Sequence, residues 1–158
     1  MSDKIEFHFK SPNESPGYLL GQVTMLWQRK QKRALDPLDL THTQFVLLAA
    51  LGWLSRERSV VTQVDIANQS NADRMMVSKV LRTLELKKFI TRQDHATDTR
   101  AKTIKLTPQG ASVLQKAIVK VETADMEFFS AVALKLPSFN ADMVKLIDTN
   151  LKDHPSPD

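Results

Sequence analysis

The most constraining feature of this sequence is the order of three short segments between residues 61 and 110. A brief helix is expected over residues 63–69, because Thr62 is a favourable N-terminal cap and Asp65 stands at the third position of a capping box. After a polar turn, Asp73 begins a longer helix. Two helices joined in this way form a helix-turn-helix.

A small basic hairpin is expected directly after the second helix. Residues 89–92 are strand-like, residues 94–100 are polar and turn-forming, and residues 102–106 alternate apolar with polar side chains. The Thr-Pro-x-Gly that follows, residues 107–110, is typical of a helix start, because proline is favoured in the first turn. Residues 59–61 are a further, very short strand candidate. A β-hairpin directly after a helix-turn-helix occupies the position of the wing in a winged-helix domain.

The remaining segments carry apolar residues at helical spacing. Asp36-Pro37 ends the first helix, Thr41 or Thr43 caps the second, and Pro137 is expected to end the longest one. The expected helices span about 17–34, 45–54, 63–69, 73–88, 108–136 and from 140 or 142 to 151, after a loose arm over 1–16. The fold class is therefore mainly α with a small β-wing, a winged helix-turn-helix of six helices and three short strands.

Composition argues against several other classes of protein. The chain has 158 residues and no cysteine, which excludes disulfides and thiolate metal sites. Its four histidines are scattered without metal-ligand spacing, and its four glycines form no phosphate-binding loop. We therefore expect no enzyme, no metal and no cofactor. The polar N-terminus has no apolar signal segment and the longest apolar run, 45–54, is too short to cross a bilayer, so we expect a cytoplasmic protein without membrane contact.

The second helix of the helix-turn-helix has two distinct faces. At about 100° per residue, its apolar residues fall on one side, and three cations, a hydroxyl and a thioether fall on the other. A helix fits the DNA major groove, where arginine and lysine donate to guanine, Ser78 can reach a base or a phosphate, and Met75 can pack on a thymine methyl. The alternative is an ordinary solvated face. The DNA-binding candidates on this helix are Asp73, Arg74, Met75, Ser78, Lys79 and Arg82.

Positive charge is concentrated in the same part of the chain. Residues 74–105 contain nine lysines and arginines and three acids, a net charge of +6, whereas the whole chain carries +4. The basic excess thus coincides with the helix-turn-helix and the hairpin, as expected of a phosphate-binding surface. The residues expected to make mostly phosphate contacts are Lys87, Lys88, Arg92 and Lys102.

The hairpin supplies a second set of DNA-binding candidates. Arg100 is expected to enter the minor groove, because a narrow minor groove attracts arginine. Asp98 lies two residues earlier and points the same way in an extended chain, so it can hold the guanidinium. The alternative is that Asp98 only forms the turn. The wing candidates are His95, Thr97, Asp98, Arg100 and Lys102.

These motifs resemble those of the MarR family of bacterial winged-helix regulators. Over residues 40–110 the order of segments agrees, with Asp98-Thr99-Arg100 as the family's D-x-R wing motif and Leu106-Thr107 at the start of the long helix. The stretch 61–92 is similar to the family's helix-turn-helix. One departure is the turn Ser70-Asn71-Ala72, where many members have glycine or a small apolar residue. Asparagine tolerates the left-handed φ that such a turn uses.

The resemblance implies an obligate helical homodimer that binds double-stranded DNA. Its expected parts are an N-terminal arm and dimerisation helix over 1–35, a winged helix-turn-helix DNA-binding domain over 36–107, and C-terminal dimerisation helices over 108–158. The apolar faces of the flanking helices need a partner, and a helix of about 28 residues exceeds what a small domain requires. The alternative is packing within one chain. A two-fold dimer implies a palindromic operator, and family precedent favours a repressor.

The resemblance also implies a small aromatic or phenolic effector. It would bind between the dimer helices and the DNA-binding lobe and loosen the grip on DNA. The lining candidates are Met25, Trp27, His42, Phe45 and Trp53. Each of them is otherwise a plain core residue, and His42 can equally be a capping or surface histidine.

A rival interpretation is a winged-helix adaptor that binds other proteins without specific DNA readout. Such adaptors usually lose the basic recognition face. The cations of residues 74–82 and Arg100 therefore favour a DNA-binding transcriptional regulator.

Overall fold

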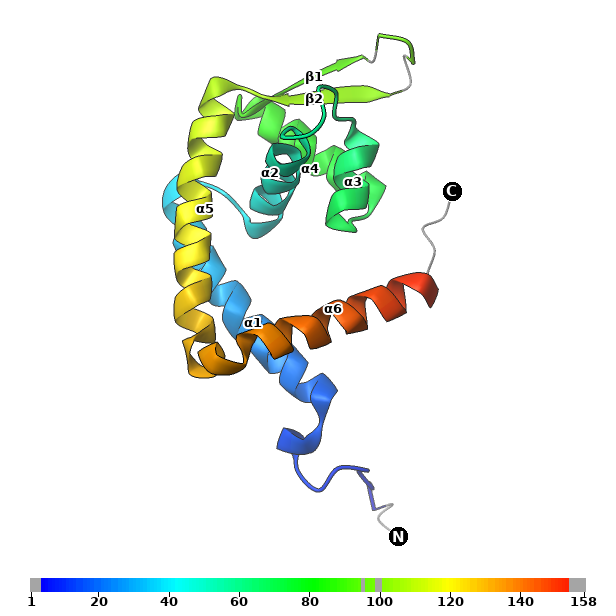
Figure 1. Ribbon diagram of the computed structural model, residues 1–158, viewed down its shortest axis with the longest axis vertical. Helices are drawn as coiled ribbons and strands as arrows, with labels where there is room; N and C mark the ends of the chain where they lie inside the picture. Colours follow the sequence, from blue (N-terminus) through cyan, green and yellow to red (C-terminus); the bar gives the residue numbers. More distant parts are fainter. Residues whose placement is uncertain (1–3, 95, 99–100, 154–158) are drawn as a thin grey trace. The chain divides into compact units, whose positions relative to one another are not determined.

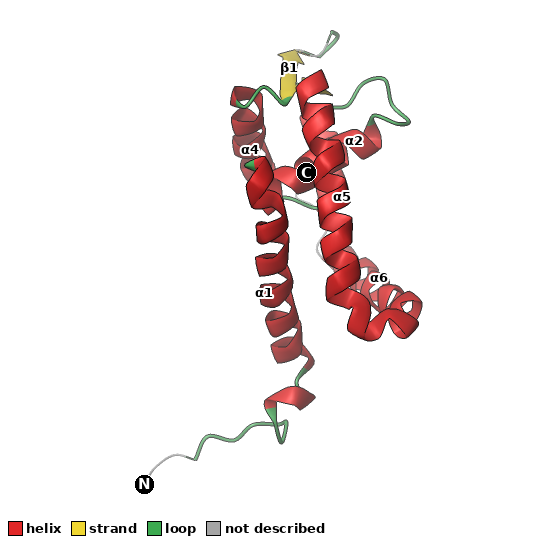
Figure 2. Ribbon diagram, turned by 90° about the vertical axis from the view of Figure 1, so that its left-hand side faces the viewer, coloured by secondary structure: helices red, strands yellow, loops and turns green. Residues whose placement is uncertain are grey.

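The structure is a computed structural model that describes residues 4–94, 96–98 and 101–153, with side chains up to Leu151. It is mostly helical with one small antiparallel hairpin, which confirms the expected fold class (Figures 1 and 2). The helices are α1 (Pro16–Leu35), α2 (His42–Leu54), α3 (Gln63–Ser70), α4 (Arg74–Leu86), α5 (Pro108–Phe128) and α6 (Leu136–Asp153). The strands are β1 (Ile90–Asp94) and β2 (Lys102–Leu106), and the 3₁₀ turns are η1 (Pro12–Glu14), η2 (Asp36–Leu38) and η3 (Phe129–Lys135).

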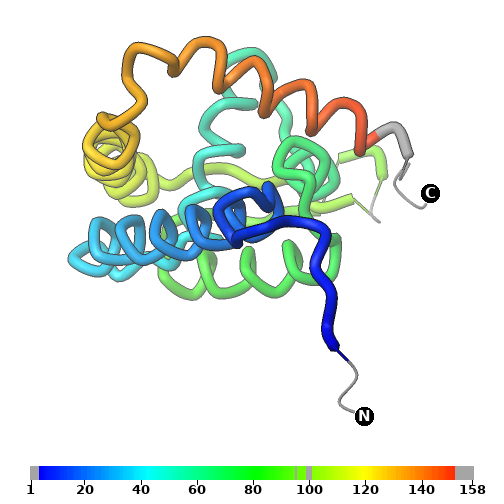
Figure 3. Tube along the Cα trace, turned by 90° about the horizontal axis from the view of Figure 1, so that it is seen from below, coloured from blue at the N-terminus to red at the C-terminus, as the bar shows by residue number. Residues whose placement is uncertain are grey.

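Side-chain caps fix where the first two helices begin. Ser15 caps α1 by accepting from the backbone N–H of Tyr18, after the arm that forms the blue end of the tube in Figure 3. Of the two cap candidates for α2, Thr41 is the cap, and it forms a reciprocal capping box with Gln44. The first helix ends at Asp36-Pro37 as predicted, in the 3₁₀ turn η2.

The core lies around α2, whose sequence is apolar on nearly every side. Leu47, Leu48 and Leu51 of α2 are almost completely buried. They pack with apolar side chains of α3, α4 and the hairpin in one cluster. Burial of this kind favours folding by about 1.5–3 kcal/mol for each large aliphatic side chain. The core therefore holds the helix-turn-helix and the hairpin together as one body.

The helix-turn-helix follows from local capping rules. Thr62 and Asp65 form the expected capping box at the start of α3. Asn71 then adopts the left-handed conformation, with φ 49°, which confirms that this asparagine serves as the turn residue. The Asp73 carboxylate caps α4 by accepting from the backbone N–H of Met76 at 2.9 Å.

The Asp65 carboxylate gives the capping box a predictable pH dependence. Partial burial raises its pKa, but hydrogen bonds from Thr62 and the nearby Arg58 guanidinium outweigh burial and leave the pKa below its ordinary value. A lowered folded-state pKa stabilises the protein above the unfolded-state pKa, and that stability is lost as pH falls through the folded-state pKa. We expect Asp65→Asn to cost about 1 kcal/mol at neutral pH, a typical value for a cap. In urea titrations, the difference in free energy of unfolding between Asp65→Asn and wild type should shrink below about pH 4. A difference that grows below that pH would contradict the assigned role of the carboxylate.

The hairpin pairs in register from Ile90 opposite Leu106 to Asp94 opposite Lys102. Its root is tied to the helix-turn-helix, because the Ile104 N–H donates to the Val61 carbonyl at 2.8 Å. The prediction of a third strand over 59–61 is wrong, because those residues form no strand and only the next residue, Thr62, makes an isolated bridge, to Thr103. The reason is that the next residue, Gln63, already starts α3, so the segment has no length left for a ladder.

The start of α5 is locked onto the loop that follows α4. The Thr107 hydroxyl accepts from the Gly110 N–H at 2.9 Å and donates to the Lys88 carbonyl at 2.7 Å. The Thr107 N–H donates to the Phe89 carbonyl at 3.0 Å. A Cβ on Gly110 would lie 1.8 Å from that same carbonyl oxygen, so only glycine fits there. The Thr-Pro-x-Gly sequence thus anchors the hairpin to the long helix.

The C-terminal helices differ from expectation. The single helix predicted over 108–136 is wrong, because α5 ends at Phe128 and Val132 has non-helical angles of φ −120° and ψ 18°. Pro137 lies in the first turn of α6 instead of ending a helix, and the first turn tolerates its missing N–H. The chain divides into two compact units, residues 1–124 and 125–158.

Candidate nucleic-acid interface

Helix α4 presents a polar, cationic face opposite its buried face. Val77, Leu81 and Leu84 are buried, as the helical spacing predicts. On the other side Met75 is 82% exposed, and the remaining members of the predicted face are exposed except Ser78, which is half-buried. The exposed members beside Met75 are Arg74, Lys79 and Arg82. Three cations and one thioether are therefore available to a ligand along this surface.

Asp73 has a structural task at this face. Its carboxylate caps α4 through the Met76 N–H, and a capping carboxylate also opposes the positive end of the helix dipole. Asp73 thus sets where the helix and its Arg74 begin. Its inclusion among the DNA-contacting residues stays a prediction.

The wing candidates are only partly within the described residues. His95 and Arg100 lie outside them, so the expected pairing of Asp98 with Arg100 stays a prediction. Thr97 and Asp98 are exposed, and the Asp98 carbonyl accepts from the Ala101 N–H at 3.1 Å. Lys102 forms an ion pair with Asp94, its partner across the hairpin.

Three of the four side chains expected to contact phosphate have hydrogen-bond or ion-pair partners within the chain. Besides the Lys102 pair, Arg92 of β1 donates to the side-chain oxygen of Gln63 in α3 at 3.3 Å. Lys87 donates to the Asp39 carbonyl and to Gln44. Lys88 is exposed, with a left-handed φ of 63° that turns the chain from α4 into the hairpin. Sequence spacing does not reveal the partners of Arg92 and Lys87, because they lie 29 to 48 residues away along the chain.

Four of the five candidate effector residues form two neighbouring groups that share Phe45. Trp27 of α1 meets His42 edge-on with ring centroids 4.9 Å apart, and His42 lies 6.5 Å from Phe45. Phe45 and Trp53 line a separate open pocket of about 590 Å³ between α2, α5 and the end of β2. Met25 is exposed on α1 and belongs to neither group.

The pocket combines aromatic walls with a cation. The Arg56 guanidinium carbon lies 4.9 Å from the centre of the Trp53 ring, a cation–π contact. Gln115 and Glu122 of α5 add polar atoms to the lining. Such a site suits a flat, partly polar molecule.

Other kinds of site find no support in the described part of the chain. Among residues 4–94, 96–98 and 101–153, no three His, Asp or Glu side chains gather as metal ligands would. Within the same ranges, none of the helices has the length and apolarity needed to cross a membrane.

Comparison with known proteins identifies the family. The sequence model of the MarR family matches residues 40–102. An uncharacterized HTH-type transcriptional regulator of Bacillus subtilis, YdcH, is 42% identical over 145 residues, which is 90% of this chain and 98% of that protein. The crystal structure of an S. aureus MepR–DNA complex is similar with a TM-score of 0.77 and 26% identity, over 85% of this chain and 98% of that one.

A further structure extends the fold comparison. BpsR of Bordetella bronchiseptica is similar with a TM-score of 0.72 and 22% identity, over 89% of this chain and 98% of that one. The fold, the basic helix face and the relatives agree, and they confirm the interpretation as a regulator and not an enzyme. This chain therefore belongs to the MarR family and is a DNA-binding transcriptional regulator.

Proposed function

We propose that this protein is a cytoplasmic repressor that binds a palindromic operator as a homodimer and reads its sequence with α4. The observation that carries the proposal is the exposed face of Arg74, Lys79 and Arg82 beside a hairpin fixed to the same core. The face suits base edges in the major groove, and the hairpin suits the adjacent minor groove. A two-fold dimer would bind half-sites about 34–36 Å apart, one turn of DNA.

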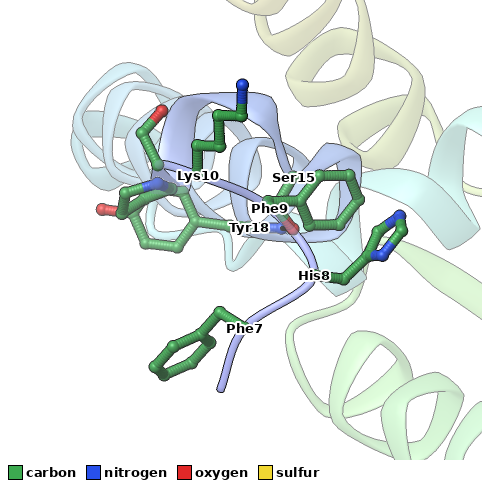
Figure 4. Close-up of a pocket in the computed structure, with 8 residues that line it drawn as sticks. Phe7, His8, Phe9, Lys10, Ser15 and Tyr18 are labelled. Carbon is green, nitrogen blue, oxygen red and sulfur yellow. Dashed lines mark hydrogen bonds between the residues drawn. The ribbon is translucent and has the colours of Figure 1, made fainter. Parts of the chain in front are cut away.

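The dimer is proposed because both flanking segments expose apolar side chains. In α1, Leu20 is 67% exposed and Leu26 50%, and in α6 Leu146 and Ile147 are also more than half exposed. The arm adds a hollow of about 380 Å³ against the first turn of α1, where Phe7, Phe9 and Tyr18 are exposed (Figure 4). Apolar surface of this extent marks an interface. We therefore assign residues 1–35 and 108–158 to dimerisation and 36–107 to DNA binding.

The operator is tested by selecting bound DNA from a random pool at near-physiological salt and again at higher salt. We expect a two-fold symmetric sequence whose affinity falls steeply with salt, because neutralised phosphates release counterions. Sedimentation at the same protein concentrations gives the oligomeric state. Salt-sensitive binding without sequence enrichment would favour the adaptor interpretation instead.

We further propose that an aromatic acid releases the DNA by binding the pocket of Phe45, Trp53 and Arg56. The aromatic walls favour a flat ring and the guanidinium favours a carboxylate. DNA binding by BpsR is regulated by 6-hydroxynicotinic acid, a molecule with this chemistry. Binding would act by preferring the conformation that holds DNA less well.

A matched pair of variants tests the pocket. Release of labelled operator DNA is titrated with a panel of hydroxylated aromatic acids, beginning with 6-hydroxynicotinic acid. We expect Arg56→Met to raise the required concentration about tenfold, as when one charged hydrogen bond is removed. Arg29→Met removes an exposed arginine of α1 and should leave the required concentration unchanged, with sedimentation as the check that the variant has the same oligomeric state as wild type. Equal titrations for both variants would place the effector elsewhere.

A further inference from the structure

We infer that Lys87 is a positioning residue for DNA binding, which fastens the end of the recognition helix to the linker between α1 and α2. Its ammonium group does not lie open to a phosphate. It donates to the backbone carbonyl of Asp39, donates to Gln44 Oε1 at 3.2 Å, and lies 3.3 Å from Asp39 Oδ2. An ammonium has three protons, and three acceptors surround this one.

The exposure of the two side chains shows which of the three Lys87 contacts is weak. The Lys87 side chain is 24% exposed, whereas the Asp39 side chain is 95% exposed. An ion pair with so exposed a carboxylate contributes little, since water screens it. The carbonyl of Asp39 and the amide of Gln44 are therefore the contacts that hold the lysine.

Both acceptors belong to rigid local structures. Asp39 has a left-handed φ of 52°, and its N–H and that of Leu40 bond back to Asp36 and Leu35 at the end of α1. The Gln44 oxygen that accepts from Lys87 also accepts from the Thr41 N–H in the capping box of α2. The Lys87 side chain thus connects the C-cap of α4 with the end of the η2 turn that follows α1 and with the first turn of α2.

The position of this contact gives it a functional consequence. Under the proposed function α1 is a dimerisation helix and α4 reads the bases, so the distance between the two recognition helices depends on how α4 is held relative to α1. Base contacts carry the sequence information, whereas phosphate contacts can be made with any DNA. Removal of the Lys87 ammonium should therefore reduce specific binding more than non-specific binding.

Lys88 provides a matched control, because it is the neighbouring lysine, is exposed and carries the same charge. Binding to the selected operator and to unrelated DNA is measured across a salt series for wild type, Lys87→Met, Lys87→Arg and Lys88→Met. Lys87→Met should weaken operator binding about tenfold, the effect expected from a misaligned base contact, with an unchanged salt slope. Lys88→Met should weaken binding to both DNAs alike. It should also reduce the salt slope, the change of log K with log salt concentration, by about 0.9 for each phosphate that a protomer no longer neutralises.

The arginine variant separates charge from geometry. It keeps the positive charge, but a planar guanidinium does not reproduce three tetrahedrally placed donors. Lys87→Arg should therefore lose operator affinity like Lys87→Met. Full operator affinity in Lys87→Arg, together with a reduced salt slope in Lys87→Met, would make Lys87 a phosphate contact and overturn the inference.

A measurement without DNA decides the contact independently of the proposed function. Amide exchange of residues 36–44 should become about tenfold faster in Lys87→Met, because the linker loses its fastening, and should be unchanged in Lys88→Met. Unchanged exchange in Lys87→Met would overturn the inference even if wild type binds its operator well. Failure of wild type to select any operator would instead contradict the proposed function, and the exchange result would still stand.

Discussion

Replacing Gly110 with alanine should lower the free energy of unfolding by about 3 kcal/mol, the upper part of the range for overpacking. The added Cβ would lie 1.8 Å from the Phe89 carbonyl oxygen and 2.7 Å from its carbon. Both are backbone atoms, and the same oxygen accepts from the Thr107 N–H, so neither side can move without breaking that bond. In a helix free of such a contact, the same substitution stabilises by about 0.5–1 kcal/mol. The expected sign is therefore reversed here.

Urea unfolding at fixed protein concentration measures this effect, since association changes apparent stability. Gly17→Ala is the control, because a Cβ built there has no atom within 4 Å apart from its chain neighbours and the nearby backbone of its own helix. Because Gly17 lies in α1, this substitution should stabilise the protein by about 0.5–1 kcal/mol, the opposite sign to Gly110→Ala. If Gly110→Ala were as stable as wild type, the close approach of α5 to Phe89 would not be a fixed feature of the fold.

Replacing Arg74 with alanine should remove sequence preference at one position of each half-site, at a cost of about 1–3 kcal/mol per contact. Arg74 is the first residue of α4, and the first turn of a recognition helix lies nearest the base edges. The neighbouring cap by Asp73 holds the start of the helix in place. Affinity is measured for the selected operator and for a panel in which each base pair is changed in turn.

The comparison for this variant is Arg29→Ala, which removes the same charge from an exposed site on α1. It should leave the preference at every position unchanged. A uniform reduction across the panel for Arg74→Ala, with a reduced salt slope, would show that Arg74 contacts a phosphate and not a base.

Local rules explain why much of the DNA-binding lobe could be predicted from sequence. The caps at Thr41, Thr62 and Asp73 and the left-handed Asn71 depend on residues within four positions, so the chain alone specifies them. The two faces of α4 follow from the helical repeat in the same way.

Tertiary contacts explain what could not be predicted. Lys87 lies 48 and 43 residues from its acceptors, and no spacing rule joins them. The break after α5 occurs although apolar residues continue at helical spacing, and there Phe129 packs edge-on against Phe128 at 5.1 Å and near Phe139 at 6.1 Å. Aromatic packing within the C-terminal unit accompanies the break. The periodicity of the apolar residues does not reveal this packing.

The anchored root of the hairpin has a consequence for changing what this protein recognises. Bonds from Ile104 to Val61 and from Thr107 to Phe89 fix the strand that carries the wing to the body that carries α4. New preferences are then best sought by randomising exposed positions of α4 while the root residues are left untouched. The variants of such a library differ in the side chains of α4 and keep the same backbone. They should therefore bind operators with the same half-site spacing as wild type and differ only in the bases that they prefer.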